Sequence, residues 1–157
     1  KTMEAIDCQH HRVDEALKAG GAAVGAKTVI ETLPGMFPLA CSPRLNDLFV
    51  ENIKEYFPET KIEDAGHFTA STDMGDISHL MPSIHPFIGG VDGGLHTKDF
   101  CVTDFDAAAI LPGKVFAMNI IDLLYDEAAM AKEILEKEKP ILTKEEYLAK
   151  LESYFQS

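Results

Sequence analysis

The histidine of the segment GGLHTKDF, His96, is the side chain best placed for chemistry in this sequence. Two pairs of glycines, at 89–90 and 93–94, precede it, and glycine lets the backbone approach a ligand closely or adopt a positive φ. A neutral imidazole is a good zinc ligand at about 2.0–2.1 Å. His96 is therefore a candidate metal ligand, although one histidine does not make a metal site.

A second group of polar side chains lies upstream, in the segment STDMGDISHLMPSIHPF, residues 71–87. Asp73 and Asp76 stand among hydroxyl groups and could orient an imidazole or hold a substrate amide. The same residue types also cap helices and form turns without any chemistry. For His79 and His85, a buried, hydrogen-bonded ring is the alternative to a role in a site. The sequence contains no GxSxG, P-loop or HExxH motif.

Predicted helices flank these residues and must position them. Residues 61–112 are rich in Gly, Asp, Ser, Thr and His, which is typical of functional loops held by a scaffold. Before them, Ser42 as N-cap followed by proline predicts a helix that runs to about Phe57. After them, an apolar stripe and then alternating charges predict helical structure over 112–139, ended by Pro140.

The two ends of the chain carry further predicted elements. Apolar spacing predicts a helix over about 4–23, and the β-rich segment Lys27–Leu33 predicts a strand. A domain boundary is predicted near Ala40, where this helix and strand give way to the helix that begins with SPRL. Near the C-terminus, Thr143 and Glu146 form a capping box that predicts a last helix.

Composition excludes several classes of protein. The chain has 157 residues and a formal net charge of −12, which argues against binding to nucleic acid or anionic membranes. No uninterrupted apolar run reaches the roughly 18 residues of a membrane span, so we expect none. Three widely spaced cysteines predict free thiols in a reducing cytoplasm. The chain starts inside a helical pattern without an initiator Met, which indicates a piece of a longer protein.

Taken together, these segments resemble the end of the aminoacylase and carboxypeptidase-G family of zinc peptidases. The similarity rests on the STDMGDIS string, on IHPF, on the later GGLHTKDF and on the helix PGKVFAMNIIDLLYD. Within the family, the combination is most similar to the amidohydrolase branch that contains p-aminobenzoyl-glutamate hydrolase and related dipeptidases. The resemblance covers nearly the whole chain, whereas the chain covers less than half of a usual family member.

The resemblance implies an α/β fold class and two domains. Residues 1–40 are similar to the last helix and strand of a ferredoxin-like lid domain, which is used for dimerisation. Residues 41–157 are similar to the C-terminal part of a three-layer catalytic domain. The resemblance thus implies a homo-oligomer, and unpaired sheet edges and uncovered helix faces in a separated piece also favour self-association.

The same resemblance implies roles for individual residues. His96 maps onto the last metal ligand of the family, which has two adjacent zinc ions. Thr72 and Asp73 map onto a loop near the metals, and His85 and Gly90 onto the substrate side. His79 departs from the relatives, which tend to carry an aromatic residue there. The other zinc ligands and the glutamate general base have no counterpart here, so we expect no catalytic residue in this chain.

The expected function is that of part of a zinc-dependent metallopeptidase or amidohydrolase. By resemblance, the parent enzyme hydrolyses N-acyl amino acids, dipeptides or similar small amides through a zinc-activated water and a glutamate. We expect the chain alone to be inactive and not to retain zinc. One alternative is a stand-alone, non-catalytic acidic module for binding or dimerisation. Another is a complete mononuclear metal site made of His79, His85 and His96.

Overall fold

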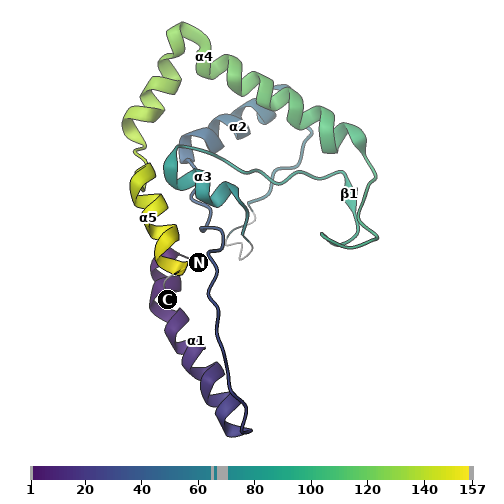
Figure 1. Cartoon of the computed structure of the whole chain (residues 1–157). Helices are drawn as coiled ribbons and strands as arrows, with labels where there is room; N and C mark the ends of the chain where they lie inside the picture. Colours follow the sequence, from purple (N-terminus) through teal and green to yellow (C-terminus); the bar gives the residue numbers. More distant parts are fainter. Residues whose placement is uncertain (1, 65, 67–70, 156–157) are drawn as a thin grey trace. The chain divides into compact units, whose positions relative to one another are not determined.

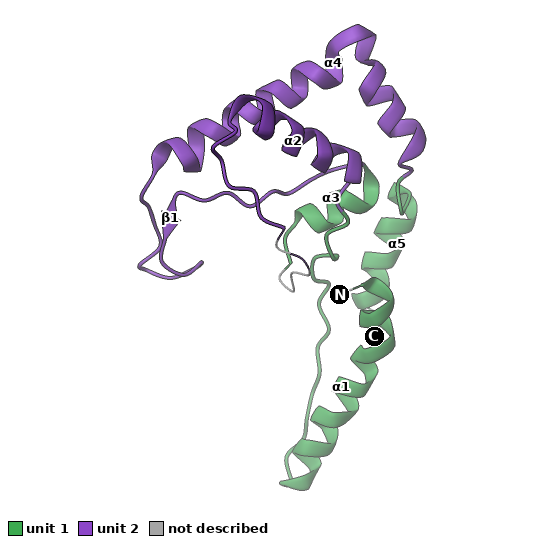
Figure 2. Ribbon diagram, turned by 180° about the vertical axis from the view of Figure 1, so that it is seen from behind, with its two compact units in different colours: residues 1–40, 67–81, 140–157 green, residues 41–66, 82–139 purple. Residues whose placement is uncertain are grey.

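The computed structural model describes residues 2–64, 66 and 71–155, which form two compact units. Unit 1 comprises Lys1–Ala40, His67–Met81 and Pro140–Ser157, and unit 2 comprises Cys41–Gly66 and Pro82–Lys139 (Figure 2). The first change of unit falls at Ala40, where a boundary was predicted. The assignment of the two sides to lid and catalytic domains stays a prediction.

Unit 2 is built on two helices that pack against each other. α2 spans Pro43–Tyr56 (Figure 1). The hydroxyl of Ser42 accepts a hydrogen bond from the amide of Leu45 at 3.1 Å. This cap, with proline at the first helical position, explains why the helix begins there and confirms the prediction. α4 spans Leu111–Lys137 and is the main packing partner of α2.

A small apolar cluster holds these two helices together. Phe49 and Ile53 of α2 surround Val115 of α4, whose side chain is 0% exposed. Three partly buried side chains complete the cluster: Phe57, Ile84 and Leu111. Beside it, the buried Asn52 amide donates hydrogen bonds to Asn119 at 2.9 Å and to Asp122 at 2.8 Å, so the polar groups between the helices are paired.

The backbone of α4 is interrupted in the middle. From Tyr125 to Ala128 the φ/ψ values are not those of an α-helix, and Asp126, Glu127 and Ala128 have positive φ. Uninterrupted helical structure over 112–139 was predicted, and the prediction was wrong at these four residues. The residues on either side follow the predicted pattern, and the helix ends at Lys137, shortly before Pro140.

The stretch Asp106–Lys137 is long and apolar enough to cross a membrane by length and composition alone. The core helix of a soluble protein meets the same criterion, so the observation has little weight by itself. We expected no span because no uninterrupted apolar run is long enough, and that expectation stays a prediction.

Four short elements were not predicted, because residues 61–112 had been interpreted as irregular. Met74–Leu80 forms α3, Val91–Asp92 and Cys101–Val102 form the antiparallel strands β1 and β2, and Asp106–Ile110 forms the π-helical turn η1 before α4. In the register of the two strands, Val91 pairs with Val102 and Asp92 with Cys101. Elements of two to seven residues carry too little periodicity to be recognised from spacing.

Unit 1 contains α1 (Met3–Ala23), α3 and α5 (Lys144–Phe155). The predicted capping box of α5 is confirmed: the amide of Thr143 donates to Glu146, and the amide of Glu146 donates to the Thr143 hydroxyl. The Thr143 hydrogen bonds hold the pKa of the Glu146 carboxyl below its ordinary value. α1 is also confirmed as a helix, although it buries none of its residues fully.

The strand predicted over Lys27–Leu33 does not form in the described part of the chain. The segment belongs to no sheet there, and Val29 and Leu33 are exposed. The prediction was wrong because strand propensity needs a hydrogen-bonded neighbour to become a strand, and the described residues offer none. The described residues are mostly helical, with one two-stranded sheet, and the three-layer α/β class stays a prediction.

Phe37 anchors the end of this extended segment in the middle of unit 1. Its ring is 2% exposed and meets the rings of His79 and Tyr147 edge-on, at 5.2 and 5.5 Å between centroids. Its amide donates to the carboxylate of Asp76 at 3.2 Å. The carbonyl of Phe37 also lies so close to Gly75 that a Cβ there would overlap it. α3 therefore requires glycine at position 75.

Replacing Gly75 with alanine should destabilise unit 1 by about 1–3 kcal/mol, because a new methyl group must displace the backbone of residue 37. Gly35→Ala is the matched control, since a Cβ at Gly35 has no neighbour within 4 Å; it should change stability by less than about 0.5 kcal/mol. The chain has no tryptophan, so urea unfolding followed by circular dichroism is the measurement. Equal effects of the two substitutions would contradict the packing described.

The α1–α5 contact of unit 1 predicts a pH dependence of stability. The Lys150 ammonium and then the Tyr154 hydroxyl donate hydrogen bonds to the Asp7 carboxylate, at 2.5 and 2.7 Å, and these bonds hold the pKa of Asp7 below its ordinary value. A carboxyl with a depressed folded pKa stabilises the fold above its unfolded pKa, about 3.9. That stabilisation is lost as the pH falls through the lower, folded pKa.

The stability difference between the wild type and Asp7→Asn should therefore be largest near neutral pH and should shrink below about pH 4. Urea unfolding of both proteins across this range measures it. A difference that stays constant with pH would show that the Asp7 carboxylate is not held by Lys150 and Tyr154.

Candidate functional site

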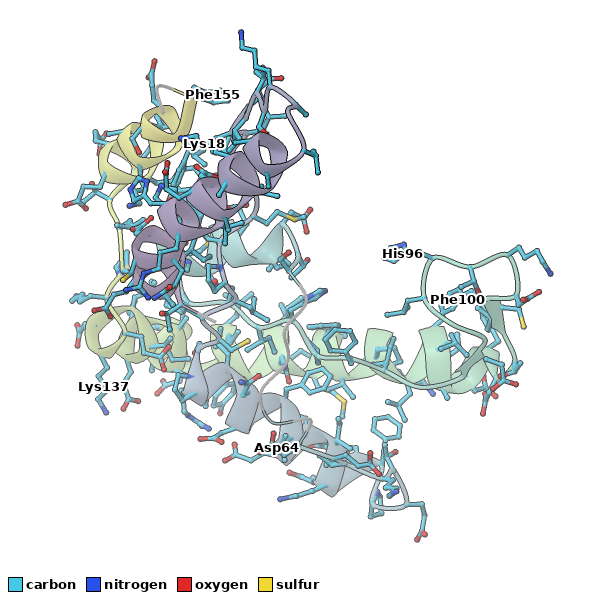
Figure 3. The ribbon with its side chains drawn as sticks, turned by 90° about the horizontal axis from the view of Figure 1, so that it is seen from below. Lys18, Asp64, His96, Phe100, Lys137 and Phe155 are labelled. Carbon is cyan, nitrogen blue, oxygen red and sulfur yellow. The ribbon has the colours of Figure 1, made fainter. Side chains whose placement is uncertain are left out.

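His96 lies in the loop of a β-hairpin in unit 2. β1 leads into residues 93–100 and β2 leads out of them, and the imidazole of His96 is exposed and points away from the loop (Figure 3). The loop is closed internally by Thr97, whose amide and hydroxyl both donate to the carbonyl of Gly94, at 3.2 and 2.8 Å. The amide of Phe100 in turn donates to the carbonyl of Thr97 at 3.3 Å.

The backbone of His96 is left-handed, with a φ of 62°. A non-glycine residue in this region costs roughly 1–2 kcal/mol and persists only where the surrounding loop imposes it. Gly93 contributes to that constraint, because it has a φ of +84° and a Cβ there would overlap the carbonyl of Asp99. The loop thus presents an imidazole to solvent on a backbone that its own hydrogen bonds define.

Hydrogen bonds to Gly90 close the base of the hairpin. The Gly90 carbonyl accepts hydrogen bonds from the amides of Thr103 and Asp104, at 2.9 and 3.1 Å. Gly90 has a φ of +85°, and a Cβ at this position would lie 2.5 Å from the carbonyl oxygen of Asp104. Position 90 therefore requires glycine, because two backbone segments approach each other closely there. The sequence predicted such a close approach at the glycine pairs before His96. The observed role of Gly90 is structural, and its substrate role stays a prediction.

His85 stands at the other end of the same segment. It is half-buried, and its ring lies 5.7 Å from that of Phe87. Its Nδ1 atom is buried and has no hydrogen-bond partner among the described residues. Buried polar atoms are nearly always paired, so this nitrogen is an exception within the part of the chain that the structure describes. Ile84, its neighbour, packs on the apolar cluster of unit 2.

Thr72 and Asp73 lie in unit 1, at the start of α3. The hydroxyl of Thr72 donates to the Asp73 carboxylate at 3.0 Å, and Asp73 is exposed. Asp73 makes no side-chain capping bond to α3. Asp76 and Ser78, by contrast, hold the preceding segment. The Ser78 hydroxyl accepts a hydrogen bond from the amide of Ala40 at 3.0 Å, and the Asp76 carboxylate accepts one from the amide of Phe37. Of the carboxylates in this motif, Asp73 is the one left for other partners.

His79 has a structural role in unit 1. It is 7% exposed, and its Nδ1 hydrogen-bonds to the carbonyl of Gly75 at 2.9 Å. Its ring packs on Phe37, which fits a position where relatives were expected to carry an aromatic residue. Within the described ranges, no three His, Cys, Asp or Glu side chains form a group that could hold a metal ion. Of the alternative ligand set, His79 lies in unit 1 and His85 and His96 lie in unit 2, and this alternative stays a prediction.

A cavity in unit 1 was missed by the sequence reasoning. It has a volume of about 330 Å³ and lies among α1, α5 and the extended segment before Phe37. The polar side chains of its lining are His10, Asp14, Thr32, Ser71 and Tyr154. The Nδ1 of His10 lies 3.2 Å from the carbonyl of Ile6. The i, i+4 spacing of His10 and Asp14 places both on one helix face, which could have been noted. Most of the apolar residues that close the cavity come from the distant segment 33–37.

Comparison with known proteins gives one informative similarity. The chain is 27% identical over 137 residues to a Xaa-Arg dipeptidase of Mus musculus, a match that covers 82% of this chain and 32% of the dipeptidase. The chain therefore spans about a third of the length of the curated relative it matches. No family model and no solved structure matches the chain. The similarity supports a peptidase or related amidohydrolase as the type of protein to which this chain is related.

The backbone constraint at His96 predicts different effects of two substitutions. Asparagine tolerates left-handed φ, whereas a β-branched residue does not. His96→Asn should leave the hairpin intact, and His96→Val should destabilise it by about 1–2 kcal/mol. Hydrogen exchange of the Thr103 and Asp104 amides, which close the hairpin on Gly90, reports the effect locally. Equal protection in the two variants would show that the loop does not impose the positive φ.

Proposed function

We propose that this chain is part of a metal-dependent peptidase or amidohydrolase that cleaves dipeptides, N-acyl amino acids or related small amides. The observation that carries the proposal is the similarity to a Xaa-Arg dipeptidase over most of the chain. The name of that relative denotes a dipeptidase for Xaa-Arg dipeptides. Such dipeptides, with a cationic side chain, are therefore the first substrates to test.

His96 is the proposed metal ligand of this chain. Its imidazole is exposed in a loop with a defined backbone. This suits a ligand of metal ions whose other ligands lie outside this chain. Two zinc ions, when bound, would supply a water activated for attack on the amide carbonyl. The fit is partial, because one imidazole cannot retain a metal well and no group of three ligands occurs among the described residues.

Other residues of the chain have proposed supporting roles. The half-buried His85 is proposed to lie on the substrate side of the site. Asp73, held by the Thr72 hydroxyl, is suited to orient a ligating imidazole or to bind a substrate N–H. No group of this chain is proposed as the general base, so the chain alone should not hydrolyse amides.

A chimera provides the functional test. The third of the mouse Xaa-Arg dipeptidase that aligns with this chain is replaced by residues 1–157, and hydrolysis of a Xaa-Arg dipeptide is measured with added Zn²⁺. We expect the chimera to be active and His96→Ala to lower kcat/KM by about 100-fold or more, because loss of even an outer partner of a metal ligand costs about 10–100-fold.

Lys98→Ala is the matched control, since Lys98 lies in the same loop and its ion pair with Asp99 is exposed. This variant should retain the activity of the chimera. A folded chimera whose activity is the same with and without His96 would refute the role of His96 as a ligand. Turnover of a dipeptide by the isolated chain would refute the proposal that it is only part of the enzyme.

A further inference from the structure

α4 carries a second apolar face that no described residue of unit 2 covers. Its buried face includes Val115 and Asn119 and packs towards α2. The opposite side of the helix is lined by small and apolar residues, all exposed, which we call the outer face of α4: Gly113, Ala117, Ile120, Ile121 and Leu124.

The outer face forms one continuous stripe. Positions 113, 117, 120, 121 and 124 follow helical spacing, and Ile120, Ile121 and Leu124 are 55%, 64% and 64% exposed. No charged residue occurs from Val115 to Ile121. A helix that is apolar on two opposite sides is typical of a buried helix between two layers or of a membrane span. The stripe is also the kind of contiguous apolar surface that marks an interaction site.

The structure of α4 favours a protein layer over a lipid bilayer as the covering partner. The backbone leaves helical geometry at Tyr125–Ala128, inside the only stretch of the described chain that is long enough to span. A bilayer requires every backbone group to be paired within the spanning segment, so such a break is costly there. The Asp122 carboxylate also accepts a hydrogen bond from Asn52 on α2, which ties this part of α4 to unit 2.

The similarity to the dipeptidase indicates which protein layer this is. A match over 82% of the chain must include its middle, and hence the first half of α4. In the dipeptidase the matched region is only 32% of the polypeptide, so about two thirds of that chain remain to cover an equivalent helix.

We propose that the outer face of α4 docks onto the part of a dipeptidase-like hydrolase that lies outside the matched third. This inference rests on the proposed function, because it takes the chain to work as part of such an enzyme. The docked part would then cover α4 on the side opposite α2, as the second layer. It would also be the source of the ligands that His96 lacks.

Co-expression tests the docking directly. The part of the mouse Xaa-Arg dipeptidase outside the aligned third is tagged and co-expressed with the untagged chain, and co-purification is measured without added zinc. The wild-type chain should co-purify in stoichiometric amount. Ile120→Glu/Leu124→Glu should lower the captured amount by about tenfold or more, since each tenfold is only about 1.4 kcal/mol.

Leu135→Glu is the matched control, because Leu135 is exposed on α4 outside the outer face; this variant should still co-purify. Circular dichroism should show that both variants fold, as the altered positions are exposed. Failure of the wild type to co-purify, or equal capture of the double variant, would overturn the proposal. So would light scattering that shows a dimer lost only in the double variant, or flotation of the chain with phospholipid vesicles through the same face.

The readout also separates this inference from the proposed function. Co-purification that depends on the outer face, with no hydrolysis in the chimera, would leave the docking correct and the proposed activity wrong. An active chimera that tolerates Ile120→Glu/Leu124→Glu would leave the activity correct and the docking wrong.

Discussion

The packing of α2 and α4 around Val115 is the contact on which the candidate site depends. Ile84 and Leu111 both pack on this cluster, and they bracket the segment that carries His85, Gly90 and His96. Both ends of that segment are therefore fixed to one apolar core. Between them, hydrogen bonds to the carbonyl of Gly90 close the hairpin and define where the loop begins. The position of the His96 imidazole within unit 2 thus follows from a few apolar contacts and two glycine-dependent turns.

Signals that are local in sequence predicted the helices well. Ser42 followed by proline specified the start of α2, and the capping box of Thr143 and Glu146 specified that of α5, because each cap is complete within four residues. The break at Tyr125–Ala128 had no such signal, since no glycine or proline occurs there. The strand predicted over Lys27–Leu33 failed for the opposite reason: its propensity was present but its partner was not.

The site was predicted unevenly. The glycines before His96 indicated a backbone of unusual conformation, and Gly90 and Gly93 have positive φ. The left-handed φ of His96 itself could not have been predicted, because it results from hydrogen bonds made by Thr97 and from the close approach of residue 99 to Gly93. Asp76 and Ser78 could not be told from Asp73 in the sequence, and long-range contacts with residues 37–40 separate their roles. Metal binding, localisation and oligomeric state stay predictions.

His96 is proposed as one ligand of a metal site completed by residues outside this chain. Zinc content after tag removal and exhaustive dialysis tests this most directly, measured for the isolated chain, the dipeptidase chimera and its His96→Ala variant. The isolated chain should retain no stoichiometric zinc, the chimera should retain it, and His96→Ala should lower the zinc content of the chimera. Stoichiometric zinc in the isolated chain, or a zinc content of the chimera that does not depend on His96, would contradict the proposal.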